Sequence, residues 1–209
     1  MDQAVAETGW RGSHEGWLGA AREMLLESGV DSVRIQPLAK RLRLSRTSFY
    51  WFFKDREALL DSLVTEWRDQ NTGAIVRQTE AYAESLAEAM LNVFDCWVDP
   101  VLFDSKMEYA IRAWALQSPA VAAHVSDADE ARIGALTQMF LRFGFPPVRA
   151  DVAARVTYLA QIGYISMQSD EDIAVRMRRF PDYISIYTGQ MPEPREMDRF
   201  MARHGYKPG

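Results

Sequence analysis

The chain has 209 residues, of which 48% are hydrophobic and 25% charged, and its formal net charge at pH 7 is −5. This is the composition of a folded globular protein that is long enough to bury a sizeable core. No apolar run approaches the roughly 18–20 residues that a membrane-spanning helix needs. The sequence therefore excludes a membrane-spanning helix, and its composition does not by itself indicate a function.

The single cysteine, Cys96, excludes an internal disulfide framework. The segment Met1–Gly12 contains acidic residues and no basic stretch followed by an apolar one, so we expect no signal peptide. Both features favour a reducing, cytoplasmic setting.

The charges are distributed unevenly along the chain. Between Val33 and Arg56, seven Lys and Arg residues stand against a single Asp, which leaves the remainder strongly acidic. A basic module attached to an acidic body is expected where one part of a protein meets phosphate groups. A solvated basic face is the alternative interpretation.

Capping residues and periodicity predict four helices in the first third of the chain. Ser13 is a candidate N-cap of the first helix, and Gly29 is its expected end. Ser45 can cap a third helix that runs to about Phe52, and Asp55 can cap a fourth. The second helix carries apolar residues at i, i+3, i+4 and i+7, namely Ile35, Leu38, Ala39 and Leu42.

The rest of the chain also has helical periodicity and contains no convincing alternating strand. The sequence therefore predicts an all-α fold. The expected helices cover residues 78–97, 105–117, 119–143, 147–167 and 171–187, followed by a short polar helix after Pro194.

Two short helices joined by a tight turn, as predicted for residues 35–52, form the helix-turn-helix plan. The second helix of such a motif enters a major groove about 12 Å wide, so its first turn needs compact or donor-bearing side chains. Arg46 can offer paired donors to guanine, and Thr47 can offer a hydroxyl, or a methyl to thymine. The phosphate-facing candidates behind them are Tyr50, Trp51, Lys54 and Arg56, with packing at the domain rim as the alternative for Tyr50 and Trp51. Phe49 and Phe53 are expected in the core.

The runs from Leu44 to Phe53 and from Asp55 to Leu60, preceded by Ala20-Ala21, Leu25 and Gly29, resemble the signature of TetR-type regulators over residues 13–63. The resemblance implies an all-helical homodimer, with a helix-turn-helix DNA-binding domain in residues 1–54 and a ligand-binding and dimerisation domain in residues 55–209. It places these residues on recognition-helix contacts: Arg46, Thr47, Ser48, Tyr50 and Trp51. Ser45, in the same first turn, is a further candidate for a DNA contact. Arg56 falls on a phosphate contact.

Three positions depart from the family pattern. Arg43 occupies the turn where the family usually has glycine, which predicts backbone strain of about 1 kcal/mol. Phe52 replaces a frequent histidine, so the phosphate contact expected there is in doubt. Val33 and Arg34 replace the residues that usually cap the second helix, and Arg34 is instead a candidate for a phosphate contact.

The resemblance also implies a pocket for a small-molecule effector in the larger domain, with no cofactor and no metal. A small apolar or aromatic ligand would suit the aromatic and Met-rich candidates for its lining, although core packing is the alternative for each. These candidates are Trp67, Phe94, Trp97, Met107, Tyr109, Trp114, Phe140 and Tyr158, together with Tyr82 and Met139. Polar anchors are available in Glu108, Arg112, His124 and Gln161, for which a solvated surface position is the alternative.

The segment 152–167 is apolar nearly all round, so both of its faces need cover. We expect one face to pack on its own domain and the other, with Val152, Val156 and Leu159, to pack on a dimer mate. A fully internal helix of a monomer is the alternative.

Motifs for phosphate loops, zinc hydrolases or redox cysteines are lacking, so an enzyme is not expected. The prediction is a repressor that leaves a pseudo-palindromic DNA operator when it binds its effector, and the alternative is an architectural DNA-binding protein.

Overall fold

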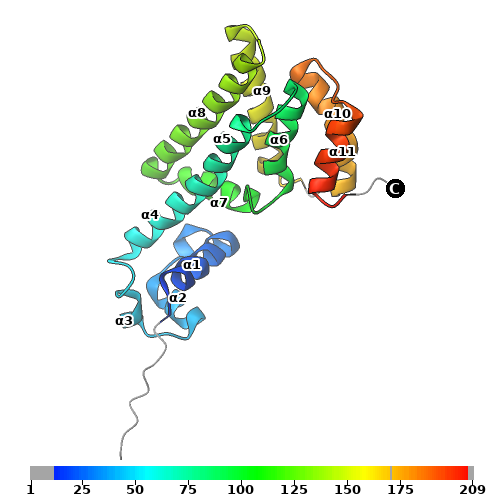
Figure 1. The fold of residues 1–209 in the computed structure, drawn as a ribbon. Coiled ribbons are helices and arrows are strands. Elements are labelled where there is room, and N and C mark those ends of the chain that lie inside the picture. The colour runs from blue at the N-terminus through cyan, green and yellow to red at the C-terminus, as the bar shows by residue number, and fades with distance from the viewer. Residues whose placement is uncertain (1–11, 170, 207–209) are drawn as a thin grey trace, which may run out of the picture. The chain divides into compact units, whose positions relative to one another are not determined.

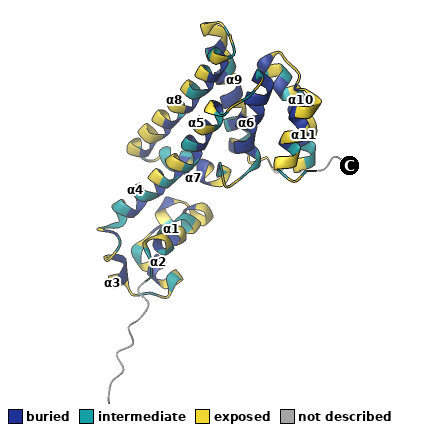
Figure 2. Ribbon diagram, in the orientation of Figure 1, coloured by how far each residue is buried: buried dark blue, intermediate teal, exposed yellow. Residues whose placement is uncertain are grey.

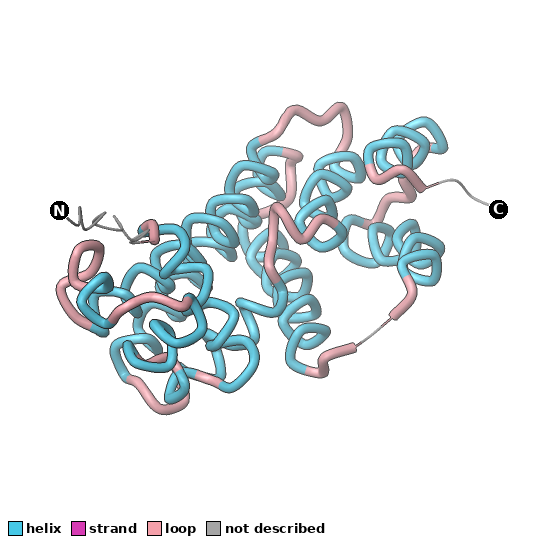
Figure 3. Tube along the Cα trace, turned by 90° about the horizontal axis from the view of Figure 1, so that it is seen from below, coloured by secondary structure: helices cyan, strands magenta, loops and turns pink. Residues whose placement is uncertain are grey.

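The computed structural model describes residues 12–169 and 171–206, and within them every regular element is a helix (Figures 1 and 3). The predicted all-α class is confirmed. The chain divides into two compact units, Met1–Glu66 and Trp67–Gly209. The sequence predicts a domain boundary after Lys54, whereas the first compact unit also includes most of the helix that follows, which is tied to this unit at its start. There the Arg56 Nε–H donates to the Val33 carbonyl at 2.6 Å.

The first unit contains α1 (His14–Ser28), a 3-10 turn (Val30–Ser32), α2 (Ile35–Leu42), α3 (Arg46–Phe49) and most of α4 (Arg56–Trp67). The predicted caps are confirmed at three helix ends. The Ser13 hydroxyl accepts the Gly16 N–H at 3.0 Å, and Asp55 accepts the Ala58 N–H at 2.8 Å. Gly29 ends α1 with a φ of 75°, a conformation that glycine adopts without strain. The third helix ends at Phe49 rather than Phe52.

The core of this unit is built around aromatic side chains. Phe49 packs edge-on against Trp17 at 5.3 Å between ring centroids, and it stacks on Phe53 at 5.5 Å. All three side chains are buried, as are Leu59 and Leu63 of α4. The expectation that Phe49 and Phe53 form the apolar back of the recognition helix is confirmed.

The second unit begins with a π-helical turn (Arg68–Thr72) that continues directly into α5 (Gly73–Glu80). The other helices are α6 (Leu86–Val98), α7 (Ser105–Ala115), α8 (Pro119–Arg142), α9 (Pro147–Ser166), α10 (Ile173–Thr188) and α11 (Pro194–Arg203). The prediction of one helix over 78–97 is wrong. A new helix begins at Ser85, whose hydroxyl accepts the Glu88 N–H at 3.0 Å, after the chain turns extended at Ala81.

Helix α6 forms the centre of one half of this unit. It contacts α5, α10 and α11 and is buried along almost its whole length (Figure 2). Polar bonds hold α11 against it, including Ser85 Oγ to Glu196 at 2.6 Å and His204 Nε2 to Asp95 at 2.7 Å. In the other half, α8 contacts α5, α7 and α9.

Helix α9 has two different faces. Ala150, Ala154 and Tyr158 are buried against its own unit, whereas the opposite stripe is exposed at Val148, Val152, Val156 and Leu159. The rival expectation of a fully internal helix is therefore wrong. None of the described helices is long and apolar enough to cross a membrane.

Candidate nucleic-acid interface and ligand pocket

The first turn of α3 presents two side chains to solvent. Ser45 caps the helix, because its hydroxyl accepts the Ser48 N–H at 3.2 Å. Arg46 and Thr47 follow the cap and are both exposed. Ser48 is buried, with its hydroxyl 2.9 Å from that of Ser45. This corrects the prediction for Ser48, which supports the cap and is withdrawn from the candidate DNA surface. Arg46 and Thr47 remain the candidates for base contacts.

Two aromatic residues follow on the same surface. Tyr50 is 54% exposed and Trp51 is 65% exposed, while Lys54 next to them is exposed as well. An aromatic residue that served only to pack at the rim would cover more of its ring. The exposure therefore favours the predicted phosphate-facing role for Tyr50 and Trp51, which stays a prediction.

Arg56 has a structural task. Its Nε–H and one Nη–H donate to the carbonyls of Val33 and Val30, at 2.6 and 2.9 Å. These bonds fix the loop before α2 to the start of α4. Arg56 also lines the groove described next, so its expected phosphate contact stays a prediction beside this structural role.

A shallow groove of the first unit brings three further cations together. Its lining includes Arg34 and Lys40 of the α2 region and Arg46 of α3. Arg34 is exposed and uses its Nε–H on the Asp31 carbonyl at 2.8 Å, which leaves its terminal donors for phosphate. Sequence reasoning counted Lys40 as basic without assigning it a contact. The neighbouring Arg41 faces away, paired with Glu27 at 2.6 Å.

The turn between α2 and α3 has the strain that its sequence predicts. Arg43 lies in the left-handed region at φ 56° and ψ 39°. Its N–H caps the end of α2 by bonding to the Lys40 carbonyl at 3.2 Å. A residue with a Cβ pays about 1–2 kcal/mol for this backbone conformation.

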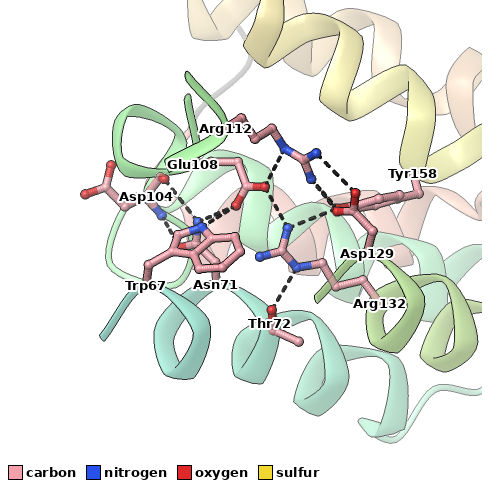
Figure 4. A network of polar contacts seen from close by, with 9 residues as sticks. All are labelled: Trp67, Asn71, Thr72, Asp104, Glu108, Arg112, Asp129, Arg132 and Tyr158. Atoms are coloured by element: carbon pink, nitrogen blue, oxygen red, sulfur yellow. Dashed lines mark hydrogen bonds and ion pairs between the residues drawn. The ribbon is translucent and has the colours of Figure 1, made fainter. Parts of the chain in front are cut away.

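In the second unit, the residues predicted to line an effector pocket separate into several environments. Phe94 and Trp97 of α6 line a pocket with residues of α9 and α10. Met107 and Phe140 are buried core residues, while Tyr109 and Tyr82 are exposed. Met139 is also core, and Trp114 is half-buried. Trp67 and Tyr158 belong to a buried polar network instead (Figure 4).

Glu108 of α7 is at the centre of this network and is fully buried. Its carboxylate accepts from the indole of Trp67 at 2.7 Å, Asn71 at 3.0 Å, Arg112 at 2.9 Å and Arg132 at 2.8 Å. Burial alone would raise the pKa of Glu108, but the charge of Arg132 and these donors hold it below its ordinary value. The carboxylate is therefore ionised, and the expectation of a solvated position for Glu108 is wrong.

A second carboxylate extends the network to α9 (Figure 4). Asp129 forms an ion pair with Arg112 and accepts a hydrogen bond from the Tyr158 hydroxyl at 2.5 Å. The Tyr158 oxygen in turn accepts from Arg132 at 3.0 Å. Burial raises the pKa of Tyr158, so this hydroxyl stays protonated and can donate. Residues of α7, α8, α9 and the π-helical turn are thus joined by side chains that fill the space between them.

The described residues contain no group of three or more His, Cys, Asp and Glu side chains that is arranged to hold a metal ion. His124, considered earlier as a polar anchor, is exposed, and Gln161 lines the α6–α9–α10 pocket. Cys96 is a buried free thiol, and burial raises its pKa to about 12.

This geometry defines an all-helical protein with an N-terminal helix-turn-helix unit. Residues 18–63 match the family model described as bacterial regulatory proteins, tetR family. The match confirms, for this N-terminal domain, the tetR-family resemblance that the sequence predicted.

The curated relatives resemble this chain over a limited length. The tetracycline repressor protein class G of Vibrio anguillarum is 33% identical over 76 residues, which cover 36% of each protein. An uncharacterized HTH-type transcriptional regulator of Bacillus subtilis (strain 168), YdeS, is 31% identical over 86 residues, covering 39% of this chain and 43% of the relative. The chain thus matches well under half the length of these relatives.

Solved structures show the same fold over nearly the whole chain. Mycobacterium smegmatis AmtR has a TM-score of 0.61 and 14% identity, with 99% of this chain and 100% of that chain covered. Salmonella enterica GusR has a TM-score of 0.59 and 16% identity, with 97% of each chain covered. At such low identity the likeness describes the architecture alone.

Proposed function

We propose that this protein is a sequence-specific DNA-binding transcriptional regulator, and more narrowly a cytoplasmic repressor that leaves its operator when it binds a small molecule. The supporting observation is a tetR-family helix-turn-helix whose α3 exposes Arg46 and Thr47. Exposed cations of the same unit, at Arg34, Lys40 and Lys54, support the proposal because they can neutralise phosphates. Phosphate contacts give affinity and register, and the α3 side chains give sequence preference.

The proposed operator is pseudo-palindromic because the proposed regulator is a homodimer. The exposed stripe of α9, with Val152, Val156 and Leu159, supplies an apolar surface that a second copy can cover. Two helix-turn-helix units held in one dimer enter successive major grooves, about 34–36 Å apart. An isologous dimer therefore requires two half-sites of opposite direction.

Release by an effector is a coupling between the two units of each chain. A ligand that binds the second unit more tightly in one state of the dimer shifts the population towards that state. In this state the distance between the two α3 helices no longer matches the distance between successive major grooves, so operator affinity falls. The loss of operator-binding free energy is at most the difference in the ligand's binding free energy between the two states. The larger unit, with its buried network and its pocket, is the part of the chain that an architectural DNA-binding protein would not need.

The experiment is selection of bound fragments from random DNA with the purified protein, followed by a screen of small molecules for release. We expect enrichment of one inverted repeat and a dimer in sedimentation, of about twice the 23.9 kDa chain mass. Leu159→Glu should give monomers with weakened operator binding. Equal recovery of all sequences would favour the architectural alternative, and a wild-type monomer would contradict the dimer.

A further inference from the structure

A pocket of the second unit is lined by six aromatic residues together with Ala160, Gln161 and Arg176. Helices α6, α9 and α10 contribute Phe94, Trp97, Tyr164, Phe180, Tyr183 and Tyr187. The empty volume is about 420 Å³, with the solvent at its mouth included. This is at the lower end of the roughly 300–1,000 Å³ of small-molecule pockets, so it suits a ligand of one ring rather than a drug-sized one.

One cation projects into this aromatic lining. The Arg176 guanidinium lies 5.6 Å from the ring centroid of Tyr164 and 6.0 Å from that of Phe180. Among the described residues, no hydrogen bond and no ion pair of this side chain is formed. Burial lowers the pKa of Arg176, which is the direction expected of a desolvated cation without a bonded counter-ion.

The carboxylate whose charge acts on Arg176 is that of Glu171, which already has two other partners. Glu171 accepts a hydrogen bond from the Tyr164 hydroxyl at 3.0 Å and forms an ion pair with Arg179. Among the described residues, Arg176 therefore has ring contacts and the more distant charge of Glu171 but no direct acceptor. A partly buried cation gains most from an anionic oxygen that replaces the water it has lost.

A second polar group of the lining lacks a partner. Trp97 is buried, and its indole Nε1–H has no acceptor among the described residues. Its ring is tilted against Phe94 at 4.7 Å between centroids. Tryptophan N–H groups usually find an acceptor when buried, so this one marks a site where an oxygen atom would be stabilising.

We propose that this pocket binds a small aromatic carboxylate, with one planar ring among the tyrosine and phenylalanine side chains and the carboxylate on Arg176. This inference deepens the proposed function, on which it rests, by naming the chemical class of the effector. It also assigns the specificity: Arg176 selects the anion, and the ring lining selects a flat, apolar body.

The test measures binding of benzoate to the purified full-length protein by calorimetry, with benzamide as the uncharged ligand of the same shape. We expect benzoate to bind and benzamide to bind at least about tenfold more weakly, because a charge-assisted hydrogen bond is lost. Arg176→Gln should reduce benzoate affinity by a similar factor and leave benzamide affinity nearly unchanged. Arg178→Gln, an exposed arginine of the same helix that does not line the pocket, is the matched control and should change neither affinity.

Trp97→Phe keeps an aromatic ring but removes the five-membered ring with its N–H, so it tests the pocket if Arg176→Gln fails to fold; weaker benzoate binding is expected. Absence of benzoate binding to a wild-type protein that still selects its operator would overturn this inference and leave the proposed function standing. A shift of the dimer dissociation constant in Arg176→Gln, without benzoate binding, would also overturn it and indicate that a second copy fills the pocket. Benzoate binding that leaves operator affinity unchanged would overturn the effector role.

Discussion

Glu108 and Arg132 meet in the interior of the second unit, where both side chains are fully buried and Arg132 Nη1 lies 2.8 Å from Glu108 Oε1. The pair joins α7 to α8, and its other bonds reach the π-helical turn and α9 (Figure 4). A buried pair of opposite charges stabilises a fold only while both partners are present, because either one alone is an uncompensated buried charge.

Removal of one partner should therefore be costly. Glu108→Leu leaves Arg132 without its carboxylate, and we expect the free energy of unfolding to fall by about 3–5 kcal/mol, measured by urea denaturation. The matched control is Asp151→Asn, which breaks an exposed ion pair with Arg155 at 3.0 Å. It should cost less than about 1 kcal/mol. Equal losses in the two variants would contradict the importance of the buried pair.

The same carboxylate makes stability depend on pH. The folded pKa of Glu108 lies below its ordinary value of 4.5, so its contribution is present above that value and is lost as the pH falls through the depressed folded pKa. Glu108→Gln should be less stable than the wild type near about pH 7, and the difference should shrink near about pH 3. Unfolding curves at the two pH values measure this. A difference that stays constant would show that ionisation of Glu108 does not stabilise the fold.

The strained turn of the helix-turn-helix gives a stabilising prediction. Arg43→Gly removes the Cβ from a residue at φ 56°. The gain of about 1–2 kcal/mol from relief of strain is offset in part by the greater freedom of glycine when unfolded, so we expect a net gain of roughly 0.5–1 kcal/mol. Thermal unfolding of the first unit reports it. Arg43→Ala keeps the Cβ and loses the charge; if it stabilises equally, charge and not backbone strain is the cause.

Two neighbouring cations should behave differently. Arg56→Ala removes two hydrogen bonds to buried loop carbonyls, and we expect it to destabilise the first unit by about 1.5–3 kcal/mol. Lys54 is exposed, so Lys54→Ala should leave the stability unchanged. The slope of log affinity against log salt should become less steep by about 0.9. The readouts are denaturation and DNA titration at several salt concentrations. The assignment fails if the two variants exchange these effects.

Local signals in the sequence predicted most of the helix ends in the first unit. Ser13, Ser45 and Asp55 are caps because their side chains accept from N–H groups three residues ahead, which depends on short-range geometry alone. The helix expected over 78–97 failed because periodicity continues across Ser85, whose capping role breaks it. Arg43 was recognised as a strained turn residue, again from a local pattern.

The second unit was less predictable because its sites combine residues that are remote in sequence. Of the partners of Glu108, Arg112 is at the local i, i+4 spacing, but Trp67 lies 41 residues earlier and no local spacing links it to Glu108. The pocket was found in part: Phe94 and Trp97 were expected, whereas Arg176 and the tyrosines of α10 were missed. Arg176 stands beside Arg178 and Arg179 in the sequence of α10, and charge alone does not distinguish a lining residue from a solvated one.

The most direct measurement is the effect of Arg46→Ala on binding to every single-base variant of the selected operator. If the first turn of α3 reads base edges, the variant should lose preference at one position of each half-site by about 1–3 kcal/mol and keep it elsewhere. Lys54→Ala should weaken all the variants alike. An Arg46→Ala profile that is parallel to that of the wild type at every position would contradict the account.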